Sequence, residues 1–190
     1  MIIKMNPEEQ SDKELYRKYL NGNNSAFEQL VIKYKNQIIF FIAGYTKDIS
    51  IAEDISQDVF VYILVNKEQY DFQYSFKTYI FMIAKCRAIN YIKREKKVVS
   101  LKEVENITEA DKELEAIIYK NDNNQMLNKK LRELKPDYQA VIYLSAFEKM
   151  KYKDIAKVMN KNLGQVKSLL NRAKKKLKKL LEEEGMTYEE

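Results

Sequence analysis

Histidine and tryptophan are absent from this 190-residue sequence, and cysteine occurs only once, at Cys86. A single cysteine cannot form a disulfide within the chain, and without histidine it lacks the base that usually activates a catalytic thiol. The sequence also shows no cluster of residues with the spacing of a metal site. We therefore expect neither an enzyme nor a protein with a metal or other cofactor.

Long apolar segments are also missing. No uninterrupted apolar run approaches the roughly 18 residues of a membrane-spanning helix. The N-terminus, MIIKMNPEEQ, lacks the apolar core of a signal peptide. These two absences predict a cytoplasmic protein without membrane insertion.

Glycine and proline are scarce, with four and two residues, whereas Leu, Ile, Lys and Glu are abundant. Few residues that break helices and many that favour them predict an all-α protein. Because 45% of the residues are apolar, the chain can bury a core.

The net charge of +6 is unevenly distributed along the chain. Residues 1–70 carry −2, 71–97 carry +5, 98–148 carry −3 and 149–190 carry +6. Two separate basic segments suggest two contacts with a polyanion such as nucleic acid, although chance clustering of surface lysines is common.

The N-terminal part of the sequence predicts three helices. The segment DKELYRKYLNGNNSAFEQLVIKY gives two of them, with Gly22 at the end of the first and a Ser25–Glu28 capping box at the start of the second. In ISIAEDISQDVFVYILV, the apolar residues share one arc of a third helix, and the opposite arc is acidic. That acidic arc contains Glu53, Asp54, Gln57 and Asp58. It fits a solvated surface or a docking face for a basic partner better than a catalytic site, because no histidine or glycine-rich loop accompanies it.

Five aromatic residues follow within ten positions, and then a basic helix. They are Tyr70, Phe72, Tyr74, Phe76 and Tyr79. Unpaired bases stack on aromatic rings, so this segment could bind a single strand, but several of the rings could equally pack in the core. The helix TYIFMIAKCRAINYIKREKK should bury Ile80, Ile83, Ala84 and Tyr91, and it presents Lys85, Asn90, Lys93 and Arg94 elsewhere.

The C-terminal part has the layout of a helix-turn-helix. An acidic, poorly periodic segment over 98–122 predicts a linker, and a helix through Leu127, Leu131 and Leu134 follows it. The first helix of the motif spans Tyr152 to Met159. Asn160 suits the turn, and Asn162 with Gln165 can cap the next helix.

That next helix, over 163–179, combines an apolar face with a basic one. Seven basic residues and no acid lie between Lys167 and Lys179. Its first turns present Lys167, Ser168, Asn171 and Arg172, at the end that a recognition helix inserts into the major groove. Asn and Arg can read base edges, while Lys and Ser can bind phosphates. Arg172 could instead pair with Asp154 or Glu148 inside the domain.

These segments together resemble an extracytoplasmic-function (ECF) sigma factor, of the sigma-70-like family of bacterial initiation factors. The matching blocks are the opening helices, AEDISQDVF, FKTYIFMIAKCRAINYIKR and the stretch from LKPDYQAVIYLSAFE to NRAKKKL, which together cover about 10–98 and 122–180. The resemblance implies two small helical domains joined by a linker. Residues 10–97 would be sigma domain 2, 98–122 the linker and 123–185 sigma domain 4.

The resemblance also implies a role for each residue set. Glu53, Asp54, Gln57 and Asp58 would dock on the β′ clamp helices of core RNA polymerase, whose β flap would contact domain 4. The −10 element of promoter DNA would contact Tyr70, Phe72, Tyr74, Tyr79, Lys85, Asn90, Lys93 and Arg94. The −35 element would contact Lys167, Ser168, Asn171 and Arg172. An anti-sigma factor is a further implied partner, and catalysis would belong to the polymerase.

A second function class explains part of the same sequence. A helix-turn-helix regulator that does not replace the housekeeping sigma factor would account for the C-terminal motif equally well. It would not account for the acidic helix or for the aromatic and basic segment that follows it.

Overall fold

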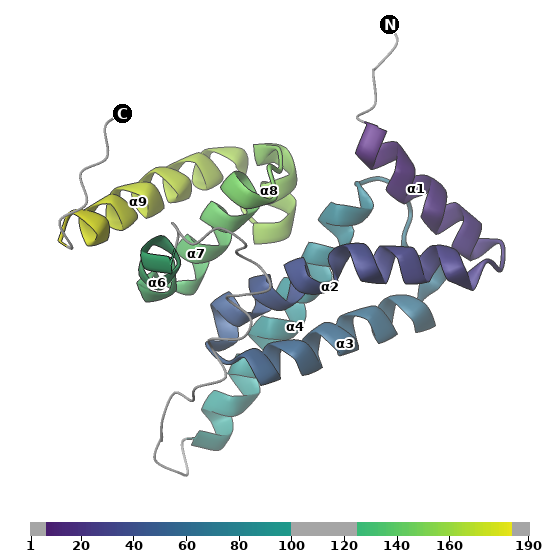
Figure 1. Ribbon diagram of the computed structural model, residues 1–190, viewed down its shortest axis with the longest axis horizontal. Helices are drawn as coiled ribbons and strands as arrows, with labels where there is room; N and C mark the ends of the chain where they lie inside the picture. The colour runs from purple at the N-terminus through teal and green to yellow at the C-terminus, as the bar shows by residue number, and fades with distance from the viewer. Residues whose placement is uncertain (1–6, 100–124, 184–190) are drawn as a thin grey trace, which may run out of the picture.

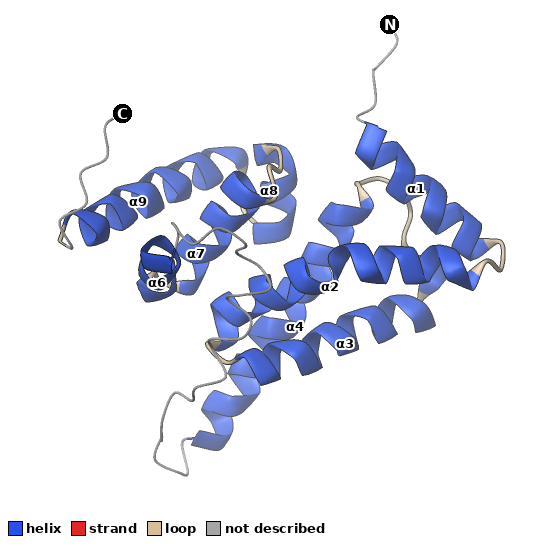
Figure 2. Ribbon diagram, in the orientation of Figure 1, coloured by secondary structure: helices blue, strands red, loops and turns tan. Residues whose placement is uncertain are grey.

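The computed structural model describes residues 7–99 and 125–183, and these residues form helices connected by short loops, without strands (Figure 2). The N-terminal unit contains α1 (Pro7–Leu20), α2 (Asn24–Thr46), α3 (Ile49–Val65), the short 3₁₀ helix η1 (Lys67–Gln69) and α4 (Phe76–Val99). The C-terminal unit contains α6 (Gln125–Glu133), α7 (Pro136–Ile142), the π-helical turn η3 (Tyr143–Phe147), α8 (Tyr152–Met159) and α9 (Leu163–Glu182). The expected all-α fold with two helical units is confirmed. The predicted linker over 98–122 lies almost wholly outside the described residues.

The N-terminal unit is built around α2, which packs against α1, α3 and α4. Its central residues are fully buried, among them Leu30, Tyr34, Ile38 and Ile42. The predicted Ser25–Glu28 capping box is wrong. Asn23 is the N-cap, because its side chain accepts a hydrogen bond from the backbone N–H of Ala26.

An aromatic cluster fixes the loop between α3 and α4. The ring of Tyr16 in α1 is fully buried, and its centroid lies 4.8 Å from that of Tyr70 and 5.3 Å from that of Phe76. The Tyr16 hydroxyl donates to the Lys67 carbonyl at 2.9 Å, and the Tyr70 hydroxyl donates to the Tyr74 carbonyl at 2.7 Å. The loop is therefore stabilised by a hydrogen bond between two of its own residues and by the contacts that Tyr16 of α1 makes with it.

The C-terminal unit contains the predicted helix-turn-helix. Asn160 ends α8 in the left-handed conformation, with φ 52° and ψ 52°. Asn162 and Gln165 form the predicted capping box at the start of α9. Buried Ile155, Met159 and Val166 lie where the two helices meet. These local predictions are confirmed.

The two units pack against each other. Contacts join α2 to α7 and α4 to α8, while α9 packs on α6, α7 and α8 and lies on the outer side (Figure 1). At the centre of this seam the buried ring of Tyr143 lies against Phe40, with centroids 4.8 Å apart, and near Phe81. The Tyr143 hydroxyl donates to the Gln37 carbonyl at 3.3 Å.

The aromatic cluster gives a stability prediction for Tyr70. Replacing Tyr70 by Ala should lower the free energy of unfolding by about 3–5 kcal/mol, because a buried ring is lost and a cavity remains. Tyr70→Phe, which removes only the hydroxyl bond to Tyr74, should cost about 1 kcal/mol. Urea unfolding followed by circular dichroism measures both values. Gln73→Ala, at an exposed position of the same loop, is the control, and an equal loss for Tyr70→Ala and Gln73→Ala would contradict the prediction.

Candidate nucleic-acid interface

The acidic arc of α3 lies on the surface. Glu53, Asp54, Gln57 and Asp58 are all exposed, and no ion pair within 7–99 or 125–183 involves these carboxylates. Asp48 begins the helix by accepting a hydrogen bond from the backbone N–H of Ile51 at 2.9 Å. The opposite face, with Ile55, Val59 and Ile63, is buried in the unit.

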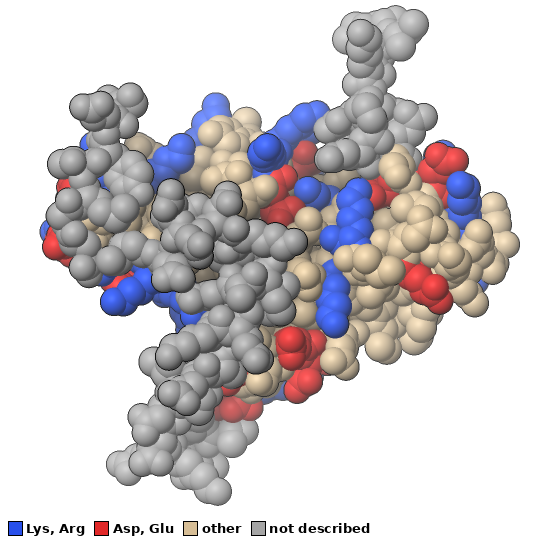
Figure 3. Space-filling model, viewed as in Figure 1, with Lys and Arg blue, Asp and Glu red and all other residues tan. Residues whose placement is uncertain are grey.

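Toward the end of α3, the exposed acidic face continues as an apolar surface, which was not predicted from the sequence. Val61, Leu64 and Val65 are 56%, 49% and 74% exposed. Their spacing from Asp54, Gln57 and Asp58 places them on the acidic arc rather than on the buried one, and this is the signal that could have identified them. Figure 3 shows a largely uncharged surface over this end of α2 and α3. The exposed face of α3 is therefore acidic at its start and apolar at its end.

The predicted −10 residues of the loop occupy three different environments. Tyr70 is 3% exposed and belongs to the core, so its ring supports the loop and offers no face to a base. Phe72 is half-buried on Tyr16 and Tyr70, beneath the Arg17 guanidinium at 5.3 Å. Tyr74 is half-buried, and the ammonium of Lys157 in α8 lies 5.4 Å from its ring centroid.

Tyr79 is half-buried at the start of α4 and stacks on Tyr70, with ring centroids 4.9 Å apart and planes at 27°. Burial raises the pKa of its hydroxyl, and Tyr62 and Asp71 contribute to the same shift. The hydroxyl lacks a hydrogen-bond partner among the described residues. One side of the ring is therefore used for packing.

The polar residues of α4 differ in their exposure along the helix. Lys85 is half-buried, and its Nζ donates to the carbonyl of Met159, the last residue of α8, at 2.9 Å. Burial lowers the pKa of Lys85. Asn90, Lys93 and Arg94 are exposed further along α4. Cys86 is exposed, and its sulfur accepts a hydrogen bond from the Asn90 side chain at 3.7 Å. The buried face of the helix contains Ile80 and Ala84 as predicted, whereas Ile83 and Tyr91 are only half-buried.

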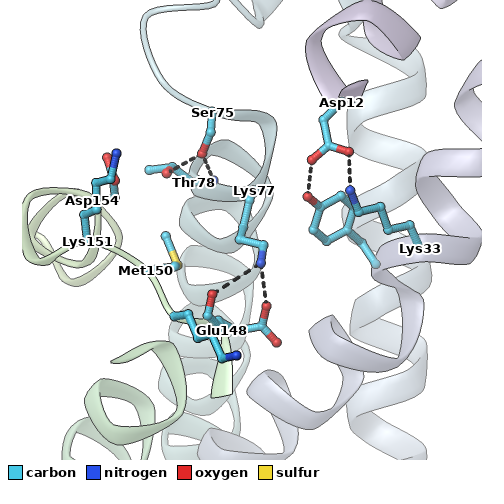
Figure 4. Close-up of a pocket in the computed structure, with 11 residues that line it drawn as sticks. Asp12, Lys33, Ser75, Lys77, Thr78, Glu148, Met150, Lys151 and Asp154 are labelled. Atoms are coloured by element: carbon cyan, nitrogen blue, oxygen red, sulfur yellow. Dashed lines mark hydrogen bonds and ion pairs between the residues drawn. The ribbon is translucent and has the colours of Figure 1, made fainter. Parts of the chain in front are cut away.

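A mixed-charge pocket of about 210 Å³ lies between the two units (Figure 4). On one side, buried Asp12 accepts hydrogen bonds from the Tyr34 hydroxyl and, at 2.7 Å, from Lys33 Nζ. On the other side, Lys77 Nζ lies 3.1 Å from a carboxylate oxygen of buried Glu148. Asp12 and Glu148 are each paired with a lysine. We therefore assign the pocket to the packing between the two units and not to the binding of a charged ligand.

All four predicted −35 residues are exposed on the outer face of α9, namely Lys167, Ser168, Asn171 and Arg172. The Arg172 guanidinium donates to the Ser168 carbonyl at 3.4 Å, and Glu148 pairs with Lys77 instead. The inner face of α9 is buried through Val166, Leu169, Leu170 and Ala173. A helix that packs on one side and presents Asn, Arg and Lys on the other can enter a DNA groove.

Within the described residues we find no group of acidic, cysteine or histidine side chains that could hold a metal ion. None of the described helices combines the length and the apolar character that crossing a bilayer requires.

Two family descriptions match successive parts of this chain. Sigma-70 region 2 matches residues 30–98, and sigma-70 region 4 matches residues 124–177. Among curated proteins, RNA polymerase sigma factor YlaC of Bacillus subtilis is 26% identical over 160 residues, which cover 83% of this chain and 92% of that protein. ECF RNA polymerase sigma factor SigM of the same species is 25% identical, covering 80% and 93%. RNA polymerase sigma-H factor of Pseudomonas aeruginosa is 25% identical, covering 92% and 95%.

Two solved structures share the fold. One is the sigma factor RpoE of Bartonella quintana, in complex with the anti-sigma factor NepR, with a TM-score of 0.67 and 21% identity. The match covers 82% of this chain and 96% of that one. The other is CnrH, in complex with the cytosolic domain of CnrY, with a TM-score of 0.65 and 21% identity over 90% and 97% of the two chains.

Proposed function

Because the chain belongs to the extracytoplasmic-function group of the sigma-70 family, we propose that it binds core RNA polymerase, recognises the −35 and −10 elements of a promoter and promotes melting. The observation that carries this proposal is the succession, in one chain, of an exposed acidic helix, an aromatic and basic segment, and a helix-turn-helix with an exposed polar face. Residues 10–97 and 123–185 are the two functional units in this proposal.

The exposed face of α3 is the docking surface for the β′ clamp helices. Its carboxylates would meet basic side chains of the polymerase, and Val61, Leu64 and Val65 would add apolar contact area beside them. Exposed charges act mainly on the rate of encounter, whereas the area buried at the centre of an interface slows release. The C-terminal unit would contact the β flap.

The −10 surface consists of α4 and the loop before it. Asn90, Lys93 and Arg94 form its exposed polar part, and Lys85 extends it toward the loop. Tyr74 and Tyr79 are the half-buried rings that can offer a face to an unstacked base. Tyr70 stacks on Tyr79 and donates to the Tyr74 carbonyl, and Phe72 packs on Tyr70. Base–aromatic stacking contributes about 1–3 kcal/mol per base, which favours the separated strand over the duplex.

The −35 element is read by α9. Asn171 and Arg172 would contact base edges, while Lys167 and Ser168 hold phosphates at the same end of the helix. The catalytic chemistry of transcription belongs to the polymerase in this proposal. An anti-sigma factor is a further proposed partner, in line with the complexes of the two structural neighbours.

The exposed face of α3 gives a test of the function. Core RNA polymerase supplemented only with this chain should initiate transcription on a library of genomic fragments from the source bacterium. The Asp54→Lys/Asp58→Lys variant should associate with core at least about tenfold more slowly at low salt, because two attractive charges become repulsive, and the difference should shrink as salt screens them.

Glu14→Lys/Glu28→Lys is the matched control, since it reverses two exposed acids of the same unit outside α3. Surface plasmon resonance gives the association rates. Transcription that still requires the housekeeping sigma factor would favour the regulator alternative. Equal association rates for the two double variants would remove α3 as the docking face.

The outer face of α9 gives a second test. Replacing Arg172 by Ala should cost about 1–3 kcal/mol at one base position of the −35 element and relax the preference there. Lys175→Ala, further along the helix, should weaken binding equally on all sequences and lower the salt slope by about 1. Selection from randomised −35 sequences with polymerase holoenzyme measures both effects. An unchanged preferred sequence for Arg172→Ala would exclude Arg172 from base reading.

A further inference from the structure

The first turn of α9 carries an apolar side chain that the packing of the helix does not use. Leu163, the first residue of α9, is 46% exposed, whereas Val166, Leu169 and Leu170 in the next turn are buried. A single exposed leucine is ordinary on most surfaces. This one lies at the end of the helix that the proposed function places in a DNA groove, so its position raises the question of what it contacts there.

The four residues proposed to contact the −35 element continue two rows that begin in this turn. One row consists, at intervals of four positions, of Leu163, Lys167 and Asn171. The row beside it consists of Gly164, Ser168 and Arg172. The N-terminal residues of a recognition helix are the ones that contact base edges. Leu163 and Gly164 would therefore lie at least as near to the bases as the four residues behind them.

Gly164 is a glycine that the chain itself does not require. Gly22 has a positive φ of 94°, but the backbone of Gly164 is ordinary α-helix. Among the described residues, a Cβ added at Gly164 would come within 4 Å of one atom, Asn162 Oδ1, at the ordinary contact distance of 3.5 Å. Glycine destabilises a helix relative to alanine. A side chain is therefore missing at a position where the chain has room for one and would gain stability from it.

Close approach of a DNA groove explains both residues. Glycine lets another molecule come near the backbone, and Leu163 beside it offers a group that can neither donate nor accept a hydrogen bond. Most groups that bases present in the major groove are donors or acceptors. The exception is the C5-methyl group of thymine, which is recognised by apolar side chains. The pair of residues thus fits a base edge that carries a methyl group.

The charge around this turn favours DNA over a protein partner. Residues 125–183 contain 16 basic and 6 acidic residues, a net charge of +10, which attracts a polyanion. A protein interface needs a much larger apolar area than one leucine supplies. The exposed neighbours of Leu163 along its row are Lys167 and Asn171, which suit phosphates and base edges.

We propose that the first turn of α9 selects thymine in the −35 element. Leu163 contacts the C5-methyl group, and Gly164 lacks a side chain because the wall of the major groove passes close to the backbone at that point. This inference rests on the proposed role of α9 in reading the −35 element. It adds to that role two residues that were not predicted from the sequence.

Removing one methyl group from the DNA tests Leu163. The DNA is the duplex that holoenzyme, assembled from core RNA polymerase and the full-length chain, selects from randomised −35 sequences. Each thymine of the selected element is replaced in turn by deoxyuridine, which lacks only the C5-methyl group. Binding should weaken about fourfold at one position, as expected for one buried methyl group.

Two variants show whether Leu163 is the residue that detects this methyl group. Holoenzyme with Leu163→Ala should bind the thymine and deoxyuridine forms equally, because the two changes remove the same contact. Ile32→Ala is the matched control, since it shortens an exposed apolar side chain of the other unit. It should retain the full difference between the two forms.

Adding one methyl group to the protein tests Gly164. Gly164→Ala should raise the melting temperature by about 1–4 °C, because alanine restricts the unfolded chain and the folded chain has room for it. The same variant should bind the selected duplex at least about tenfold more weakly, because the added methyl group meets the DNA. Binding to a duplex of unrelated sequence depends mainly on charge and should change by less than about twofold.

Each other outcome identifies what fails. A selected −35 element without thymine, or a methyl dependence that persists in Leu163→Ala, would overturn the assignment of Leu163. Unchanged binding by Gly164→Ala would mean that DNA does not approach the backbone there, and a lowered melting temperature would mean that the fold requires the glycine. Either result overturns the assignment of Gly164. If the wild-type chain with core polymerase selects no −35 sequence at all, the proposed role of α9 is at fault, and the inference fails with it.

Discussion

The ammonium group of Lys85 at the C-terminus of α8 fixes how the two halves of this protein face each other. Helix ends expose carbonyls that need donors, and here the donor comes from a residue 74 positions away in the sequence. Lys47 does the same at the end of α6. The apolar part of the seam is centred on Tyr143, whose ring packs against Phe40 and lies near Phe41 and Phe81. The seam therefore combines these polar contacts with apolar packing that joins the cores of the two units.

In the proposed function the two units contact different elements of a promoter, so the contacts between them matter for how DNA is read. Lysines that leave water lose hydration, and their lowered pKa values reflect that loss. The bonds they make across the seam offset it only while the units stay together.

Local features could be predicted from the sequence, whereas pairings between distant segments could not. Asn160 and Asn162 were identifiable because a left-handed turn and an N-cap restrict residue type at one position. The cap at α2 was misassigned because Asn23 and Ser25 both suit that role, and only the backbone path decides between them.

Contacts between segments that are distant in the sequence could not be predicted, for a different reason. Nothing in the local pattern indicates that Tyr16 packs on the loop before α4, or that Lys85 meets α8, since helical periodicity does not identify the neighbour of a face. The exposed residues Val61, Leu64 and Val65 could have been found from their position on the acidic arc of α3, but apolar residues are more often assigned to a core. The exposed apolar residues of α3 were therefore not predicted because their residue type suggests a core. The contacts between the two units were not predicted because the residues that make them are far apart in the sequence.

The most direct test of the account is the distance between the two units before and after polymerase binding. Dyes attached to cysteines introduced at Gln29 and Lys175, both exposed, in a Cys86→Ser chain would report this distance by single-molecule energy transfer. The account predicts one population of high transfer efficiency for the free chain and a fall in efficiency when core RNA polymerase is added. An efficiency that is the same in the free chain and in the polymerase complex would contradict it.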